Sequence, residues 1–188
     1  DVLLFNQFSN HCLANTIEPL RAANTLAGNK LYQWRYTSLE GGEVLSSSGL
    51  PVATKELNAK QGNVDLLFAM PSYGYRKLAT PAVFSALRKA EKRAGTMIGL
   101  DTGAWLFAAA GLLDGKKATI HSAILEDFSE RFLSVDVRSD RLVVDQNYIT
   151  CGGAMAAFDL ALHLINIKQG AILKHDVETF FLYHGESP

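Results

Sequence analysis

Residues 95–103 read GTMIGLDTG, and residues 104–115 continue as AWLFAAAGLLDG. The first stretch contains a short apolar run typical of a buried strand, and the second has the composition and length of a helix. Glycines on both sides of Asp101 mark a sharp corner between them. In an α/β hydrolytic fold, such a corner lifts one side chain above the sheet and aims the free N–H groups of the helix at whatever binds there. The stretch therefore predicts a nucleophile elbow, with Asp101 at the tip where Cys or Ser would be expected.

The chain on both sides of this corner alternates between strand-like and helix-like patterns. Continuous apolar runs of strand length lie at 2–5, 64–70 and 96–100. Helical patterns lie at 13–28, 81–94, 103–113, 123–132, 153–168 and 170–183. Further strands are expected at 34–41 and 117–122, and a small hairpin at 44–57. Residues 142–151 are expected to form two strands on either side of a turn at 145–147. This alternation is typical of an α/β sandwich, in which helices cover both faces of a mostly parallel sheet.

The boundaries of this fold carry recognisable signals. Gly28 is expected to end the first helix, and Thr80 followed by Pro81 is expected to begin the helix at 81–94. No Pro/Ser-rich linker or internal repeat divides the chain. We therefore predict one domain over residues 1–183, with the polar residues 184–188 beginning a linker.

Composition excludes several classes of function. The chain has 188 residues, of which 48% are hydrophobic and 20% charged, and its net charge of -1 offers no basic excess for binding nucleic acid. Two cysteines are too few for a disulfide framework, and no apolar stretch reaches the ~20 residues of a membrane span. A cytoplasmic protein without a membrane partner or cofactor is expected. Adjacent His11 and Cys12 lack a second ligand pair, so no metal site is predicted.

Asp101 has two open interpretations. As the N-cap of a helix over 102–113, it would satisfy free N–H groups. As a ligand-facing carboxylate, it would lie at the positive end of that helix, whose field is expected to lower its pKa. An ionised carboxylate is a poor nucleophile toward amides and thioesters, and it would repel an oxyanion.

Other candidate residues are weaker. His121 lies near the end of an expected strand, where ligands bind in doubly wound folds, although a lone histidine is more often a structural hydrogen-bonding residue. Cys151 precedes Gly152 at a second strand-to-helix corner and is most simply a small buried residue. Glu18 and Arg21 are expected to form a surface ion pair on one helix.

Several motifs together resemble a known family. They are VLLFNQFSNHCLANTIEPLRAAN, which includes EPLRAAN at 18–24, then GLDTGAWLFAAAGLLDGKKATIHS at 99–122 and ITCGGAMAAFDLALHLI at 149–165. The order resembles the ThiJ/PfpI group of the class I glutamine amidotransferase-like superfamily. It is most similar to the N-terminal half of AraC/XylS-type transcription regulators. The resemblance spans nearly the whole chain, and 99–122 is its most specific part.

The resemblance implies a flavodoxin-like sandwich and a role in sensing. Enzymes of the superfamily carry a nucleophilic Cys at the elbow and a His shortly afterwards, positions that match Asp101 and His121 here. The lost thiol argues against cysteine chemistry. Regulators of this kind resemble sensors of small, often nitrogen-containing metabolites, and they bind DNA through a separate C-terminal helix-turn-helix domain. The residues expected around an effector are Asp101, Thr102, Gly103, His121 and Cys12.

Three hypotheses follow. The first is a ligand-sensing domain that forms a homodimer through the apolar helices of 153–183. The second is an enzyme with altered chemistry, in which Asp101 acts as base or covalent carboxylate and His121 as acid. The third is an oligomerisation module whose pocket is filled by side chains.

Overall fold

The computed structural model describes residues 1–57 and 62–183, so the expected linker at 184–188 lies outside the described residues. An eight-stranded sheet in the order β3-β4-β2-β1-β5-β6-β10-β9 forms its centre. Its strands are β1 (Val2–Leu4), β2 (Tyr36–Ser38), β3 (Gly42–Leu45), β4 (Pro51–Glu56), β5 (Val64–Met70), β6 (Ala94–Leu100), β9 (Leu142–Asp145) and β10 (Tyr148–Cys151). In this order, every neighbouring pair of strands from β4 through to β10 is parallel. The two edge strands are antiparallel to their neighbours, β3 to β4 and β9 to β10. The mostly parallel sheet is confirmed.

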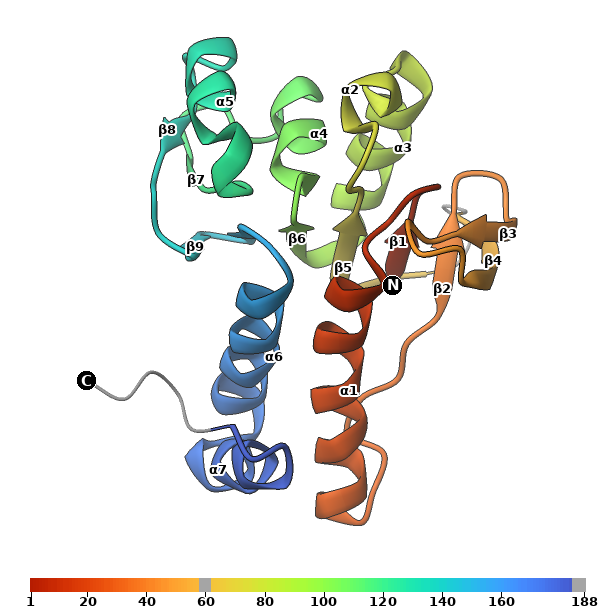
Figure 1. Cartoon of the computed structure of the whole chain (residues 1–188), viewed down its shortest axis with the longest axis vertical. Coiled ribbons are helices and arrows are strands. Elements are labelled where there is room, and N and C mark those ends of the chain that lie inside the picture. The colour runs from red at the N-terminus through yellow and green to blue at the C-terminus, as the bar shows by residue number, and fades with distance from the viewer. Residues whose placement is uncertain (58–61, 184–188) are drawn as a thin grey trace.

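Helices cover both faces of this sheet (Figure 1). They are α1 (Asn10–Ala27), α2 (Tyr75–Leu78), α3 (Pro81–Glu91), α4 (Gly103–Ala109), α5 (Leu125–Arg131), α6 (Ala154–Gln169) and α7 (Ala171–Phe180). Helices α3 and α4 pack on one face, and α1 and α6 lie side by side on the other. Helix α7 packs on α1 and α6 beyond the sheet. A short pair, β7 (Lys117–Ala118) and β8 (Asp136–Val137), lies beside α5.

The unbroken apolar strands are explained by burial on two sides. Successive side chains of a strand point to opposite faces. Leu3 therefore joins the core beneath α3 and α4, while Val2 and Leu4 join the core beneath α1 and α6. In β5, Leu67 likewise joins the core beneath α3 and α4, and Phe68 joins the core beneath α1 and α6. The side chains of all five of these residues are buried.

The predicted helix signals are mostly confirmed. The Thr80 hydroxyl accepts a hydrogen bond from the Val83 N–H at the start of α3, and Gly28 ends α1 with a left-handed φ of 66°. Helix α4 is shorter than expected and ends at Ala109, because the chain turns at Gly111, whose φ is 75°. The strand expected at 117–122 is wrong beyond Ala118. There the chain leaves the β7 ladder, and a 3-10 turn follows at Ser122–Ile124.

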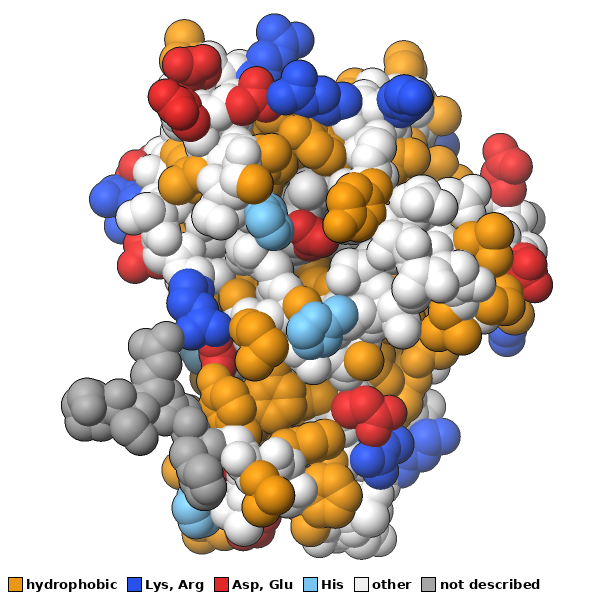
Figure 2. Space-filling model, in the orientation of Figure 1, with side chains coloured by type: hydrophobic (Ala, Val, Ile, Leu, Met, Phe, Trp, Pro, Cys, Tyr) orange, Lys and Arg blue, Asp and Glu red, His pale blue; other side chains and the backbone are white. Residues whose placement is uncertain are grey.

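The described helices include none that is both long and apolar enough to cross a lipid bilayer. The surface still carries exposed apolar side chains, and many gather over the lower half of the molecule, around α1, α6 and α7 (Figure 2). Those on the two C-terminal helices and just after them are Met155, Ile167, Ile172, Phe180 and Leu182.

A buried ion cluster lies at the start of β1, at the opposite end of the sheet from the elbow. The Asp1 carboxylate is 1% exposed and contacts two guanidinium groups, those of Arg35 and Arg93. The Arg93 Nη2 atom lies 2.8 Å from Asp1 Oδ2, and its side chain is only 8% exposed. A buried carboxylate is tolerated because cations and hydrogen bonds compensate for its lost hydration.

We expect Arg93→Met to destabilise the protein by about 3 kcal/mol, because it leaves the Asp1 carboxylate buried with one cation in place of two. Chemical denaturation measures this change. Arg21→Met is the matched control, since Arg21 forms an exposed pair with Glu18 and its loss should cost less than about 1 kcal/mol. Equal effects of the two substitutions would contradict the structural role of the cluster.

Candidate functional site

The corner after β6 has the backbone geometry of an elbow. Asp101 has a φ of 57°, in the left-handed region that non-glycine residues rarely adopt. Its N–H donates to the Cys151 carbonyl at 3.0 Å, and its carbonyl accepts from the His121 N–H at 3.1 Å. These bonds tie the tip to β10 on one side and to the turn after β7 on the other. Neighbouring backbone thus holds a conformation that costs about 1–3 kcal/mol.

Glycines allow the chain segments to approach this closely. A Cβ atom on Gly103, the first residue of α4, would lie 2.8 Å from the Ala69 carbonyl oxygen. A Cβ atom on Gly152 would lie 2.9 Å from the Ile120 carbonyl oxygen. Neither backbone oxygen can move without disrupting the sheet or the turn. The glycines on both corners are therefore required for the elbow to close.

The N-cap interpretation of Asp101 is wrong. The N-cap of α4 is Thr102, and its side chain makes no capping hydrogen bond. Instead the buried Thr102 hydroxyl donates to the Ser72 carbonyl at 3.1 Å, which ties the corner to the segment after β5. The Asp101 carboxyl makes its own contact with the same segment, a hydrogen bond with the Ser72 side chain.

The predicted direction of the Asp101 pKa shift is also wrong, because the pKa is raised and not lowered. Burial raises the pKa of the Asp101 carboxyl above its ordinary value of 3.8, because the ionised form loses hydration. A hydrogen bond from Ser72 and the nearby His121 favour the ionised form, but they only partly offset the burial. Within the described chain, no lysine or arginine forms an ion pair with Asp101. The corner holds a half-buried carboxyl with no strong cation beside it.

His121 lies beside the elbow and has a structural contact of its own. Its Nδ1 atom accepts a hydrogen bond from the Ala123 N–H at 3.2 Å. A neutral ring that accepts at Nδ1 carries its proton on Nε2, so His121 offers an N–H donor there. The ring also packs beside the second corner, where its Cδ2 atom lies 3.6 Å from the position that a Gly153 Cβ would take.

Neither cysteine replaces the missing nucleophile. Cys12 and Cys151 are 1% and 0% exposed. Burial raises the pKa of Cys12 well above its usual range and that of Cys151 to about 12. Both are thus held as thiols, and the thiolate is the reactive form. Cys151 is the small buried residue that the sequence suggested.

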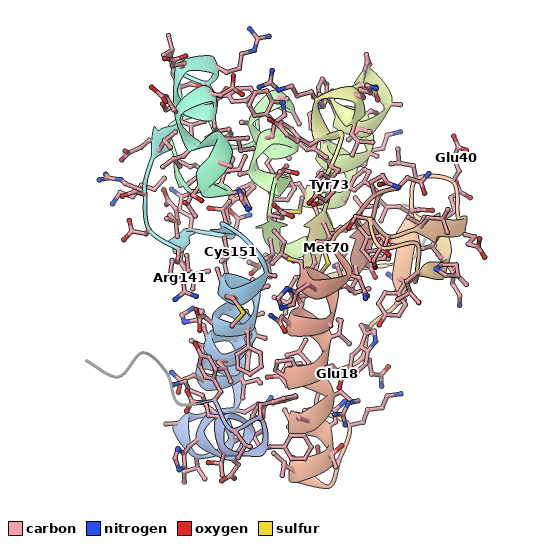
Figure 3. All side chains as sticks on the ribbon, viewed as in Figure 1. Glu18, Glu40, Met70, Tyr73, Arg141 and Cys151 are labelled. Atoms are coloured by element: carbon pink, nitrogen blue, oxygen red, sulfur yellow. The ribbon has the colours of Figure 1, made fainter. Side chains whose placement is uncertain are left out.

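The structure brings the predicted site residues together and adds one. Asp101 interacts electrostatically with both His121 and Cys12, while Thr102 and Gly103 complete the corner. Figure 3 labels Met70, Tyr73 and Cys151 around the ends of the strands that carry this site. Ser72 was missed, although PSYG at 71–74 directly follows a buried strand, where parallel folds place ligand-binding loops. No group of residues suited to hold a metal ion occurs in the part of the chain that the structure describes.

Comparison with known proteins identifies the family. The DJ-1/PfpI family description matches residues 2–167. The chain belongs to the DJ-1/PfpI family. Among curated relatives, it is 35% identical to the HTH-type transcriptional regulator CdhR of Pseudomonas aeruginosa, over 96% of this chain and 53% of CdhR. It is 34% identical to the regulator GbdR of the same species, over 96% of this chain and 49% of GbdR.

A solved structure extends the comparison. The AraC family transcriptional regulator from Pseudomonas putida superposes with a TM-score of 0.81 at 26% identity, covering 96% of this chain and 97% of that one. The flavodoxin-like DJ-1/PfpI fold is therefore shown. The chain spans about half the length of the curated regulators that it matches.

The raised pKa of Asp101 predicts a specific pH dependence. The unfolded chain releases this proton near pH 3.8, whereas the folded protein retains it to a higher pH. Stability is therefore lost as the pH rises from that value through the folded-state pKa, and the loss persists above it. Asparagine tolerates a left-handed backbone and carries no charge. We expect Asp101→Asn to melt above the wild type near neutral pH, with a difference that shrinks as the pH falls toward about 4.

Thermal unfolding across that pH range measures this difference. Asp140→Asn is the matched control, since it removes an exposed carboxylate and should leave the melting temperature nearly unchanged throughout. A melting temperature of Asp101→Asn below that of the wild type near neutral pH would show that the ionised carboxylate stabilises the fold.

Proposed function

We propose that residues 1–183 form the ligand-sensing and dimerising domain of an AraC-type transcription regulator. Its effector is a small metabolite with a cationic or N–H-donating group that binds at Asp101. A separate helix-turn-helix domain of the regulator would bind DNA. The matched relatives support the regulatory class, since CdhR and GbdR are HTH-type transcriptional regulators and the solved relative is an AraC family regulator.

One observation supports an effector site at the elbow. Asp101 keeps the strained left-handed backbone conformation of the elbow, and its carboxyl lacks a strong cationic partner. A conformation that costs free energy persists only where the surrounding structure enforces it, and such conformations cluster at functional sites. A bound cation would offset the lost hydration of the Asp101 carboxylate and favour its ionised form. His121 and Ser72 would complete the polar surroundings of the ligand.

The same geometry argues against catalysis. The carboxyl at the tip, whose burial favours the neutral form, is a weaker nucleophile than the thiolate it replaces. The Cys12 and Cys151 thiols are buried and held in their unreactive form. His121 accepts a backbone N–H through Nδ1, a contact that protonation of the ring would break. We therefore infer that the elbow binds its ligand without transforming it.

A panel of amines, amino acids and betaines tests the effector site. At least one should raise the melting temperature, since a ligand that binds only the folded state adds about 2.7 kcal/mol of stability at a hundredfold excess over its Kd. Asp101→Ala should abolish most of that shift, whereas Asp140→Ala should preserve it. Equal shifts in Asp101→Ala and the wild type would place the effector elsewhere.

Dimerisation has its own support and its own test. The exposed apolar side chains of α6 and α7 offer a surface that water solvates poorly. We expect a dimer in sedimentation at micromolar concentration, and we expect Ile172→Glu to weaken it at least tenfold by burying a charge in the interface. Leu133→Glu is the control, because Leu133 is similarly exposed but lies after α5. A monomeric wild type would contradict the proposal.

A further inference from the structure

Helix α7 ends in a turn that places a leucine in a conformation normally taken by glycine. The Leu182 N–H donates to the Thr179 carbonyl at 3.0 Å, and the Tyr183 N–H donates to the Glu178 carbonyl at 2.9 Å. These two bonds form a Schellman motif, in which the left-handed residue is usually glycine. Here that residue is Leu182, which has a φ of 52° and is 78% exposed. The turn is therefore strained, and burial of the leucine does not offset the strain.

Tyr183 holds this turn by packing onto α6. Its ring centroid lies 4.7 Å from that of Phe158, and its hydroxyl donates to Asp159 Oδ1 at 2.5 Å. Phe181 meets the same Phe158 ring edge to face at 5.4 Å. The strain at Leu182 favours release of Tyr183, whereas the ring contact and the hydrogen bond to a carboxylate favour the packed position. These opposing contributions are comparable in size, so a small change at Asp159 shifts the balance.

The Asp159 carboxylate is shared with a second partner. Arg141, in the segment before β9, has its Nη2 atom 3.0 Å from Asp159 Oδ2. One carboxylate oxygen thus accepts from Tyr183 and the other pairs with Arg141, so a single side chain joins the end of α7 to the segment before β9. The ion pair is partly exposed to water and is weak on its own, so it can break at little cost.

Both members of this ion pair are attached to the second corner of the elbow. The Arg141 carbonyl accepts the Gly152 N–H at 3.1 Å, and Asp159 belongs to α6, which begins two residues after Gly152. The preceding residue, Cys151, accepts the Asp101 N–H. Figure 3 shows Arg141 and Cys151 near the end of α6 that adjoins the sheet. A movement of this corner therefore alters how Arg141 and Asp159 face each other.

We propose that Tyr183 is a latch that couples the second corner of the elbow to the end of α7. In the latched state Tyr183 is packed on α6 and Leu182 keeps its left-handed turn. In the released state the Tyr183–Asp159 hydrogen bond is broken and Leu182 relaxes, which supplies the two-state element that such coupling requires. Coupling is reciprocal, so a change at either end alters the stability of the other. Its use in signalling rests on the proposed function, in which the predicted linker at 184–188 follows Tyr183.

Amide hydrogen exchange, followed residue by residue by NMR in the intact protein, tests the latch without any effector. Tyr183→Phe keeps the ring and removes only the hydrogen bond of its hydroxyl. The amides of residues 182 and 183 should exchange about fivefold faster and the Gly152 amide about threefold faster, while the amides of β5, which report global unfolding, keep their rates. Lys174→Met is the matched control, since it removes an ion pair within α7 and should leave the Gly152 amide unchanged.

Two further variants act in other directions. Leu182→Gly removes the strain, because glycine adopts the left-handed conformation at no steric cost, and it should slow exchange at both Tyr183 and Gly152. Arg141→Met should speed exchange at Tyr183, because the Asp159 carboxylate loses the partner that holds it in place.

The Gly152 amide decides the outcome. A rate that does not rise in Tyr183→Phe and fall in Leu182→Gly would overturn the latch, and so would a rate that changes only in step with the amides of β5. Failure of the amine panel to bind would leave all these rates as they are, so the latch and the proposed effector site fail separately.

Discussion

The site depends on one backbone conformation, the left-handed turn at Asp101 between β6 and α4. Hydrogen bonds to Cys151 and from His121 hold it, and these reach the corner only because β10 pairs with β6 and the turn after β7 lies alongside. Gly103 and Gly152 permit the approach, since a side chain on either would collide with a backbone oxygen. The architecture that would expose a nucleophile is therefore intact, although the nucleophile is absent.

The electrostatic character of the corner follows from a competition between two effects. The helix N-terminus favours a negative charge by about 0.3–1 kcal/mol at an exposed position. Helix α4 has only seven residues, and burial acts on the carboxyl in the opposite direction. Burial prevails and raises the pKa, so Asp101 is a carboxyl that gains from a cationic partner. A recognition role accounts for this arrangement better than nucleophilic catalysis does.

The sequence predicted most of the fold because the relevant signals are local. Continuous apolar strands, the Thr80 cap and the glycine corner each depend on neighbouring residues. The remaining features depend on segments distant in the sequence. The sign of the Asp101 pKa shift is set by burial among segments distant in the sequence, which outweighs the opposing hydrogen bond from Ser72. The course of the chain at His121 is set by contacts outside the β7 strand. Arg76 forms an ion pair with Asp127, 51 residues away in the sequence, so no short motif could have indicated this contact.

If the Asp101 carboxyl is a desolvated recognition group, its pKa must respond to a bound cation. Carbon-13 NMR of the aspartate carboxyls, with the Asp101 signal assigned from the Asp101→Asn spectrum, measures this pKa directly. We predict a value above 3.8 in the free protein and a lower value once the most stabilising amine is bound, because a cation favours the ionised form. A pKa at or below 3.8 in the free protein, or one that this amine leaves unchanged, would contradict the recognition role.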